Sequence, residues 1–436
     1  MSKVVISYSK PTERMRYSAD ILFRVCLGID VEWNKEVELD SYGYTIKSET
    51  KTIVCPIHSL SMNDDKAARS SGVRWTDWRG FKFPAEVLGV TDLVFDPLAS
   101  AFFCCSRWEE FPSMGDINTT ERDSHGRYKG NQSAAFSEGM LRTPLVENLA
   151  WAISAELNLK HPVSSRDYEF KPTIDVDIAY AYLGRSVFHS IAASARDLIL
   201  FRWSNFVNRI QVLLKGDGDP YDSYNYFLSL HEDQNLSTIC FIHYAEYNRP
   251  YDLGVSKPYL DSLITKLRGR AKICWHPSYA ATQERGEKFK MEKKSFEDKG
   301  IVEEVRTHFL RGQSSIWREF QENSILHDYS MGYADQPGFR AGMSRPFPAF
   351  DIENNEPLEL IIHPFAIMDS TLMTYLQLDA DSSIQLVGEM SDAVRKVGGV
   401  MVSVWHNTSV SDHGIWKGWQ SLYEDVVRRC LPSSHE

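Results

Sequence analysis

From residue 171 onward, short apolar runs alternate with segments of helical periodicity, and this alternation limits the possible folds more than any other feature. We expect strands at 172–178, 237–244, 271–276, 301–306, 325–329, 358–365 and 399–406. We expect helices between them at 196–214, 221–231, 257–267, 283–299, 313–322 and 382–397. Strands and helices in turn indicate a parallel sheet, and about seven repeats indicate a closed or nearly closed barrel. The predicted fold class is therefore α/β.

The chain before residue 166 has a different pattern. At 436 residues the chain is too long for one ordinary core. We therefore interpret 1–165 as a smaller N-terminal α/β domain of unknown role and 166–436 as the barrel. The polar loop 112–132 contains Asp123-Ser-His-Gly-Arg-Tyr128. We expect a solvated connector there, with a functional loop as the alternative.

Charge and composition limit the kinds of partner and the compartment. The net charge of −11 argues against nucleic acid, because phosphate binding requires a basic face. No apolar stretch is long enough to span a bilayer, so we expect no transmembrane segment. The first residues do not resemble a secretory signal, so the expected compartment is the cytoplasm. The seven cysteines lie mostly in apolar segments and are expected to be buried, reduced thiols.

Acidic, basic and imidazole side chains follow several of the predicted strands. Asp175 and Asp177 are two residues apart at the end of the first strand, so both can point into one cavity. The other strand ends, or the segments just after them, contain His276, Arg306, His308, Arg340 and His406. Each residue alone has a simple structural explanation, such as a cap, a core histidine or an ion pair. Together they are predicted to converge, because the carboxyl ends of parallel strands meet at one edge.

This set of groups fits a metal-assisted hydrolysis. A divalent ion polarises a carbonyl and lowers the pKa of water, while a carboxylate takes the proton and an acid protonates the leaving group. Asp177, His276 and His308 are the candidate ligands, Asp175 the base and His406 the acid. An arginine beside the base would keep its pKa low.

The order of these residues resembles that of the polysaccharide deacetylases of carbohydrate esterase family 4, the NodB homology group. Thr173-Ile-Asp-Val-Asp177 looks like a variant of the first family motif, which supplies base and metal ligand. His276 falls where the second motif begins, and His406 matches the motif that supplies the acid. Residues 1–165 resemble an uncharacterised domain that precedes the deacetylase domain in a divergent, Bacteroidetes-type branch. The resemblance implies a distorted (β/α)7 barrel and a divalent metal, often zinc.

The chain also departs from the family pattern. The second motif normally has a second histidine four residues on, where this chain has Ala280. We expect His308 to replace it as a ligand. Arg306 or Arg340 would orient Asp175, and the sequence leaves the choice between them open.

The resemblance implies that the substrate is an N-acetylated sugar in cell-surface polysaccharide or lipopolysaccharide synthesis. Aromatic side chains near the strand ends could stack on sugar rings. These are Trp275, Tyr279, Tyr333, Trp405 and Trp416. Two alternatives remain: a glycosyltransferase that uses the Asp-x-Asp pair to hold manganese, and a glycan-binding protein that has lost its catalytic activity. The sequence does not show which proteins, if any, are its partners.

Overall fold

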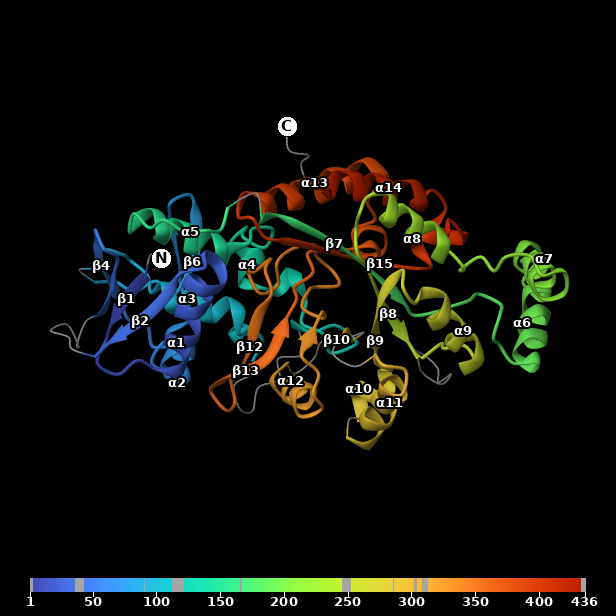
Figure 1. Cartoon of the computed structure of the whole chain (residues 1–436), viewed down its shortest axis with the longest axis horizontal. Helices are drawn as coiled ribbons and strands as arrows, with labels where there is room; N and C mark the ends of the chain where they lie inside the picture. The colour runs from blue at the N-terminus through green and yellow to red at the C-terminus, as the bar shows by residue number, and fades with distance from the viewer. Residues whose placement is uncertain are drawn as a thin grey trace.

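In the computed structural model, two sheets lie one after the other along the long axis of the molecule (Figure 1). The structure describes residues 3–35, 43–89, 91–111, 121–164, 167–244, 252–284, 286–301, 304–307 and 313–432. The seven cysteines are all free and buried, as expected from the sequence. None of the helices in these ranges combines the length and apolar character needed to cross a membrane.

The first part of the chain forms a four-stranded sheet in the order β2-β1-β3-β4, together with a separate hairpin of β5 and β6. Its strands are β1 (Lys3–Ser7), β2 (Asp30–Asn34), β3 (Gly43–Lys47), β4 (Thr52–Pro56), β5 (Trp75–Trp78) and β6 (Phe81–Pro84). Its helices are α1 (Glu13–Ala19), α2 (Asp65–Ser71), α3 (Pro97–Cys105), α4 (Ala134–Ser137) and α5 (Leu145–Glu156). At the start of helix α3, Pro97 occupies the first turn, and the Asp96 carboxylate accepts hydrogen bonds from two backbone N–H groups.

The second part forms a nine-stranded sheet in the order β12-β13-β11-β10-β9-β8-β7-β15-β14. Its strands are β7 (Glu169–Val176), β8 (Thr238–His243), β9 (Ala271–His276), β10 (Glu304–Val305), β11 (His327–Asp328), β12 (Phe347–Asp351), β13 (Glu356–Ile362), β14 (Ile367–Met368) and β15 (Val400–His406). Its helices are α6 (Val187–Ile199), α7 (Trp203–Ile210), α8 (Tyr224–Asp233), α9 (Lys257–Leu267), α10 (Tyr279–Glu284), α11 (Glu287–Glu297), α12 (Gln313–Glu322), α13 (Ala380–Lys396) and α14 (Trp419–Cys430). Neighbouring strands in this order pair parallel, except β12, which pairs antiparallel to β13.

The nine-stranded sheet is strongly curled. Only residues 363–366 connect β13 to β14, although seven strand steps separate these strands in the sheet. A flat sheet would place them about 33 Å apart, and the connection can span roughly 18 Å. The Phe365 N–H donates to Met331 O, just after β11, and the Ala366 N–H to Val402 O on β15, each at 3.0 Å, so this segment contacts two parts of the sheet that lie five strand steps apart in the strand order. In the described ranges β13 and β14 are not paired with each other, and closure of the predicted barrel is therefore not confirmed.

The helix boundaries differ from the prediction in two places. The segment predicted as one helix at 196–214 contains the end of α6 and all of α7, because Phe201 has a left-handed backbone (φ 54°) that ends the first helix. The segment 283–299 is likewise divided near Gly286, which also has positive φ (58°). The other predicted helices lie within a few residues of their observed positions. Strands β12 and β14 were not predicted.

The two parts share one continuous hydrophobic core. The Tyr17 ring of α1 lies 4.9 Å from the Phe350 ring of β12, and its hydroxyl donates to Pro348 O at 2.9 Å. On α5, the buried Glu147 carboxylate accepts hydrogen bonds from the backbone N–H and hydroxyl of Ser344. The N-terminal part is thus fixed against the sheet that carries the predicted site.

Candidate functional site

Asp175 lies at the carboxyl end of β7 and is paired with Arg306. The carboxylate is 4% exposed, and its Oδ1 accepts from Arg306 Nη1 at 2.8 Å. The same guanidinium donates to Thr173 Oγ1 at 2.7 Å and to Tyr329 O at 3.0 Å, and it lies 4.4 Å from the centre of the Phe241 ring. These contacts fix the guanidinium, so Asp175 has a fixed orientation and a permanent positive neighbour.

Asp177 follows β7 immediately and faces two histidines. Its Oδ1 lies 3.1 Å from His276 Nε2, and its Oδ2 lies 3.7 Å from His406 Nε2. His276 ends β9 and is 1% exposed. The prediction that the two aspartates and these two histidines come together is therefore fulfilled in the geometry, while their chemical roles remain predictions.

His243 is a residue of this cluster that the sequence reasoning missed. It ends β8 and is paired in register with His276, and the two ring centroids lie 6.0 Å apart. Its Nε2 lies 3.5 Å from Oδ1 of Asp252. Burial and the neighbouring His276 lower the pKa of His243 to about 4, against the opposite effect of Asp177 and Asp252, so its imidazole is neutral at neutral pH. Its position at a strand end was the signal that could have identified it.

His406 is held by a second residue that the sequence did not assign, Asp369. His406 ends β15, and its Nδ1 lies 2.8 Å from Asp369 Oδ1, while the other carboxylate oxygen accepts the His406 backbone N–H at 2.8 Å. Burial alone lowers the pKa of His406, but the carboxylates of Asp369, Asp177 and Asp175 together raise it to about 10. The imidazole is therefore protonated at neutral pH, with Nε2 directed toward Asp177.

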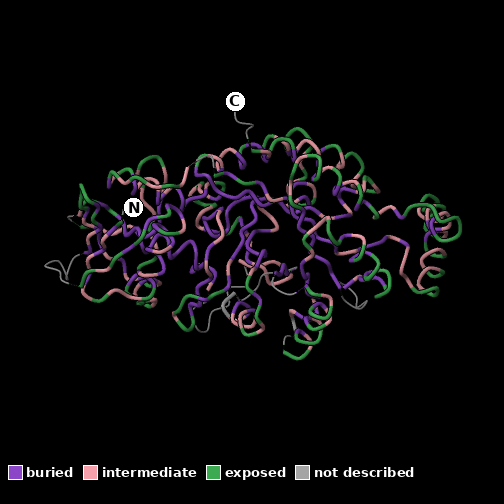
Figure 2. Tube along the Cα trace, viewed as in Figure 1, coloured by how far each residue is buried: buried purple, intermediate pink, exposed green. Residues whose placement is uncertain are grey.

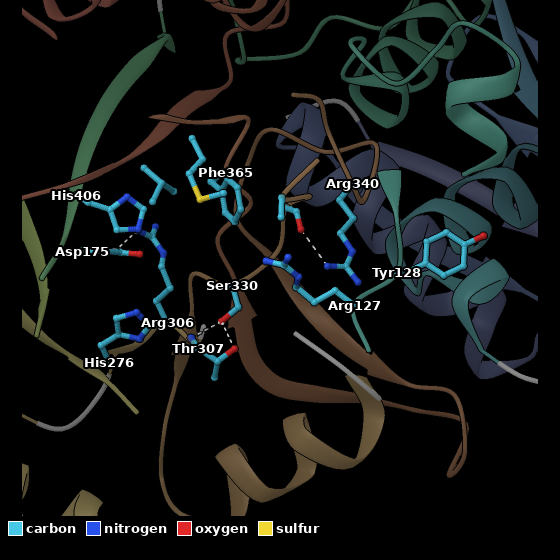
Figure 3. Close-up of a pocket in the computed structure, with 14 residues that line it drawn as sticks. Arg127, Tyr128, Asp175, His276, Arg306, Thr307, Ser330, Arg340, Phe365 and His406 are labelled. Atoms are coloured by element: carbon cyan, nitrogen blue, oxygen red, sulfur yellow. Dashed lines mark hydrogen bonds and ion pairs between the residues drawn. The ribbon is translucent and has the colours of Figure 1, made fainter. Parts of the chain in front are cut away.

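Four residues of this cluster line one pocket (Figure 3), whereas Asp177, His243 and Asp369 are not among its lining residues. Asp175, Arg306, His276 and His406 gather on one side of it. The remaining lining residues are Arg127, Tyr128, Thr307, Ser330, Gly332, Ala334, Arg340, Phe365, Met368 and Val404. A Cβ on Gly332 would lie 2.3 Å from the Phe365 ring, so this close approach requires glycine.

The N-terminal part contributes directly to the pocket. Arg127 and Tyr128 belong to the polar loop that we expected to be a solvated connector, and both line the cavity. The Arg127 guanidinium donates to Asp123 Oδ2 at 2.6 Å and to the Tyr375 hydroxyl at 2.8 Å. The connector interpretation is therefore wrong for these two residues; loop polarity alone does not distinguish a side chain in water from one in a pocket.

Several other predicted residues are not part of the cluster. Arg340 lines the pocket, but its guanidinium pairs with Glu110 at 2.6 Å, so Arg306 is the arginine on Asp175. Trp275, Tyr333 and Trp405 are at most 2% exposed and belong to buried packing rather than to a sugar-stacking surface. Neither Tyr279 nor Trp416 lines this pocket. His308 lies outside the described residues.

Two side chains of the cluster are placed so that both could bind one divalent metal ion. Two ligand atoms on one tetrahedral zinc ion are about 3.3 Å apart, and Asp177 Oδ1 and His276 Nε2 are separated by 3.1 Å. Carboxylate oxygen and imidazole nitrogen are both common zinc ligands. Within the described ranges, no three His, Cys, Asp or Glu side chains form a complete metal site.

The fold and the site define an α/β protein with a pocket lined by one aspartate, two histidines and three arginines at the carboxyl edge of the parallel strands. Residues 4–162 match a family of unknown function, DUF7033. No match is found among curated proteins.

The chain is distantly similar in structure to polysaccharide deacetylases. One, from Mycobacterium smegmatis, is 13% identical, with 63% of this chain and 87% of that chain covered and a TM-score of 0.39. Another, from Bordetella bronchiseptica and described as involved in O-antigen biosynthesis, is 12% identical, with 61% and 98% covered and a TM-score of 0.33. A 4-alpha-glucanotransferase from Thermococcus litoralis is 17% identical, with 62% and 38% covered and a TM-score of 0.32.

Proposed function

We propose that this protein is a metal-dependent hydrolase that removes the N-acetyl group from a sugar. The observation that carries the proposal is the convergence of three pairs at one pocket. These are Asp175 with Arg306, Asp177 with His276, and His406 with Asp369. They provide a base, candidate metal ligands and an acid, which are the groups that hydrolysis of an amide requires.

The chain's own residues account for the proton transfers. Asp175 accepts a proton from water, whose oxygen bonds to the acetyl carbon. Arg306 holds the Asp175 carboxylate in a fixed orientation through its hydrogen bond. The carbon–nitrogen bond then breaks, and His406 donates its Nε2 proton to the departing amine, which leaves acetate and the free amino sugar. A divalent ion, when bound, supplies Lewis acidity toward the carbonyl oxygen and lowers the pKa of water.

We further propose zinc as the ion, with Asp177 and His276 as two of its ligands and His243 as the candidate for the third, although no three such side chains stand together as a metal site in the described residues. The register of β8 and β9 places His243 directly beside His276, so it can fill the position that Ala280 leaves without a ligand. His308, which the sequence suggested for this position, is the competing candidate. The proposed compartment is the cytoplasm, and the proposed process is the synthesis of a cell-surface polysaccharide or lipopolysaccharide.

Acetate release tests the proposed function. The purified protein is expected to release acetate from at least one N-acetylated saccharide in a panel, and a chelator is expected to reduce the rate to background, because metal loss removes the Lewis acid. Added zinc should restore the rate. If no acetate appears from any saccharide with zinc present, the protein is not this deacetylase.

The histidines of the site distinguish hydrolysis from the alternative function, glycosyl transfer. An Asp-x-Asp pair that held a manganese–diphosphate complex would not need histidines at the site. In the structure Asp175 is instead paired with an arginine and Asp177 with a histidine. Replacement of His276, His308 and His406 by alanine is expected to abolish acetate release, whereas a glycosyltransferase would remain active.

Metal content distinguishes the two candidates for the third ligand. We expect His243→Ala to weaken zinc binding by more than the roughly 10–100-fold that loss of an outer hydrogen-bond partner costs, because a direct ligand is removed. His308→Ala should retain zinc. The measurement is zinc titration against a competing chelator, with His231→Ala as a control for loss of a buried histidine elsewhere. Loss of zinc in His308→Ala but not in His243→Ala would show that His308 is the third ligand, as the sequence suggested.

A further inference from the structure

Helices α6 and α7 form a hairpin that projects from one end of the molecule (Figure 1). Figure 2 shows this hairpin as mostly intermediate and exposed, in contrast to the buried strands of the sheet. Many of the exposed large apolar side chains of the described residues are concentrated here. They are Val187, Phe188, Ile191, Ile199, Leu200, Phe201, Trp203, Val207, Leu213 and Leu214.

The hairpin has its polar and apolar sides reversed relative to an ordinary helix pair. The buried residues of α6 and α7 are Asp197 and Arg209, whose side chains form an ion pair at 2.7 Å between the two helices. On α6 the apolar stripe Phe188, Ile191 and Ile199 has helical spacing and lies on the face opposite Asp197. The hairpin is thus held together by a buried ion pair while its apolar stripes face outward.

The turn between α6 and α7 contains a residue in an unfavourable backbone conformation. Phe201 has φ of 54°, a left-handed conformation that is unusual for a bulky side chain and that asparagine or glycine adopts more readily. Its ring is 77% exposed, so no packing within the described chain compensates for this strain. Trp203, two residues later, is 58% exposed. Strained backbone positions are concentrated at functional sites such as ligand clamps and switch regions.

The charge of the hairpin identifies the kind of contact. From the start of α6 to Lys215, residues 187–215 contain four arginines and lysines and one aspartate, a net charge of +3, in a chain whose net charge is −11. Two hairpins of neighbouring copies would repel each other, whereas an anionic surface would attract one. Exposed aromatic and aliphatic side chains beside basic residues are characteristic of helices that lie in the headgroup region of a bilayer.

We propose that the α6–α7 hairpin binds the surface of an anionic lipid bilayer, with Phe188, Phe201 and Trp203 inserted among the headgroups. Arg196, Arg202 and Lys215 are all exposed and would contact the lipid phosphates. The contact is peripheral. It does not depend on the proposed deacetylase activity.

Vesicle flotation of the full chain tests this inference. The protein is expected to float with vesicles of phosphatidylcholine and phosphatidylglycerol, and much less with phosphatidylcholine alone. Combined Phe188→Ser, Phe201→Ser and Trp203→Ser should reduce the bound fraction at least about tenfold, because the apolar contact is lost. Combined Arg196→Glu, Arg202→Glu and Lys215→Glu should do the same through charge. Leu88→Ser with Ile415→Ser, which replaces exposed apolar residues elsewhere, is the matched control and should bind as the unchanged protein does.

The variant Phe201→Asn distinguishes a loss of vesicle binding from a loss of folding stability. Asparagine tolerates the left-handed backbone, so the thermal unfolding temperature should stay the same or rise while vesicle binding falls. Three results would overturn the inference: no flotation of the unchanged protein, equal flotation of the hairpin variants, or a concentration-dependent dimer that the hairpin variants abolish in the absence of lipid binding.

Discussion

Asp175→Asn is expected to reduce kcat for acetate release by about 10²- to 10⁴-fold, the usual contribution of a positioned base. Asparagine has nearly the same shape and can still accept a hydrogen bond from Arg306, but it cannot take a proton from water. Because Asp175 is not a proposed metal ligand, the zinc content should remain that of the unchanged protein. Steady-state kinetics and metal analysis of the same preparation provide both measurements.

Asp351→Asn is the matched control for this substitution. Asp351 is fully buried on β12 and is paired with Arg318 at 2.6 Å, so the change also removes a carboxylate from a partly buried ion pair. We expect it to lower the thermal unfolding temperature while kcat stays unchanged. A variant Asp175→Asn that keeps full activity, or that loses zinc together with activity, would show that Asp175 is not the base.

The helices and strands that were predicted correctly are those whose local sequence pattern agrees with their environment in the folded protein. Helices 257–267 and 313–322 match α9 and α12 because their apolar spacing and end signals lie within a few neighbouring residues. Strands β12 and β14 were missed because tertiary pairing defines them. β14 has two residues, and it exists because the curl of the sheet brings 367–368 beside β15. Two residues are too few to show the alternation of side chains by which a strand is predicted from sequence.

The site was predictable to the extent that it depends on strand ends. Asp175, Asp177, His276 and His406 all follow apolar runs, and parallel strands place such residues at one edge. The choice between Arg306 and Arg340 was not predictable, because it depends on Glu110, which is distant in sequence and pairs with Arg340. Asp369 and Arg127 were missed for the same reason: each reaches the site from a different segment by tertiary packing.

Asp369→Asn is expected to lower the pKa of His406 from about 10 toward its ordinary value, because the closest carboxylate becomes neutral. The folded pKa of His406 exceeds its unfolded value of about 6.5. Its contribution to stability is therefore fully present below pH 6.5 and is lost as the pH rises through about 10. The variant should lose this contribution at neutral pH. Titration of the His406 ring by NMR in the metal-free protein, with the signal assigned from its absence in His406→Asn, gives the pKa directly.

The same pKa governs the proposed acid step, so the pH dependence of kcat provides a second measurement. His406 must be protonated to donate to the amine, and kcat of Asp369→Asn should begin to fall at a lower pH than kcat of the unchanged protein. Asp392→Asn is the control, because Asp392 is an exposed carboxylate paired with Arg429 on the outer helices and its loss removes one charge far from the pocket. If Asp369→Asn and the unchanged protein share the same alkaline limb, His406 is not the acid, and Asp369 serves only to anchor the end of β15 through its backbone contact.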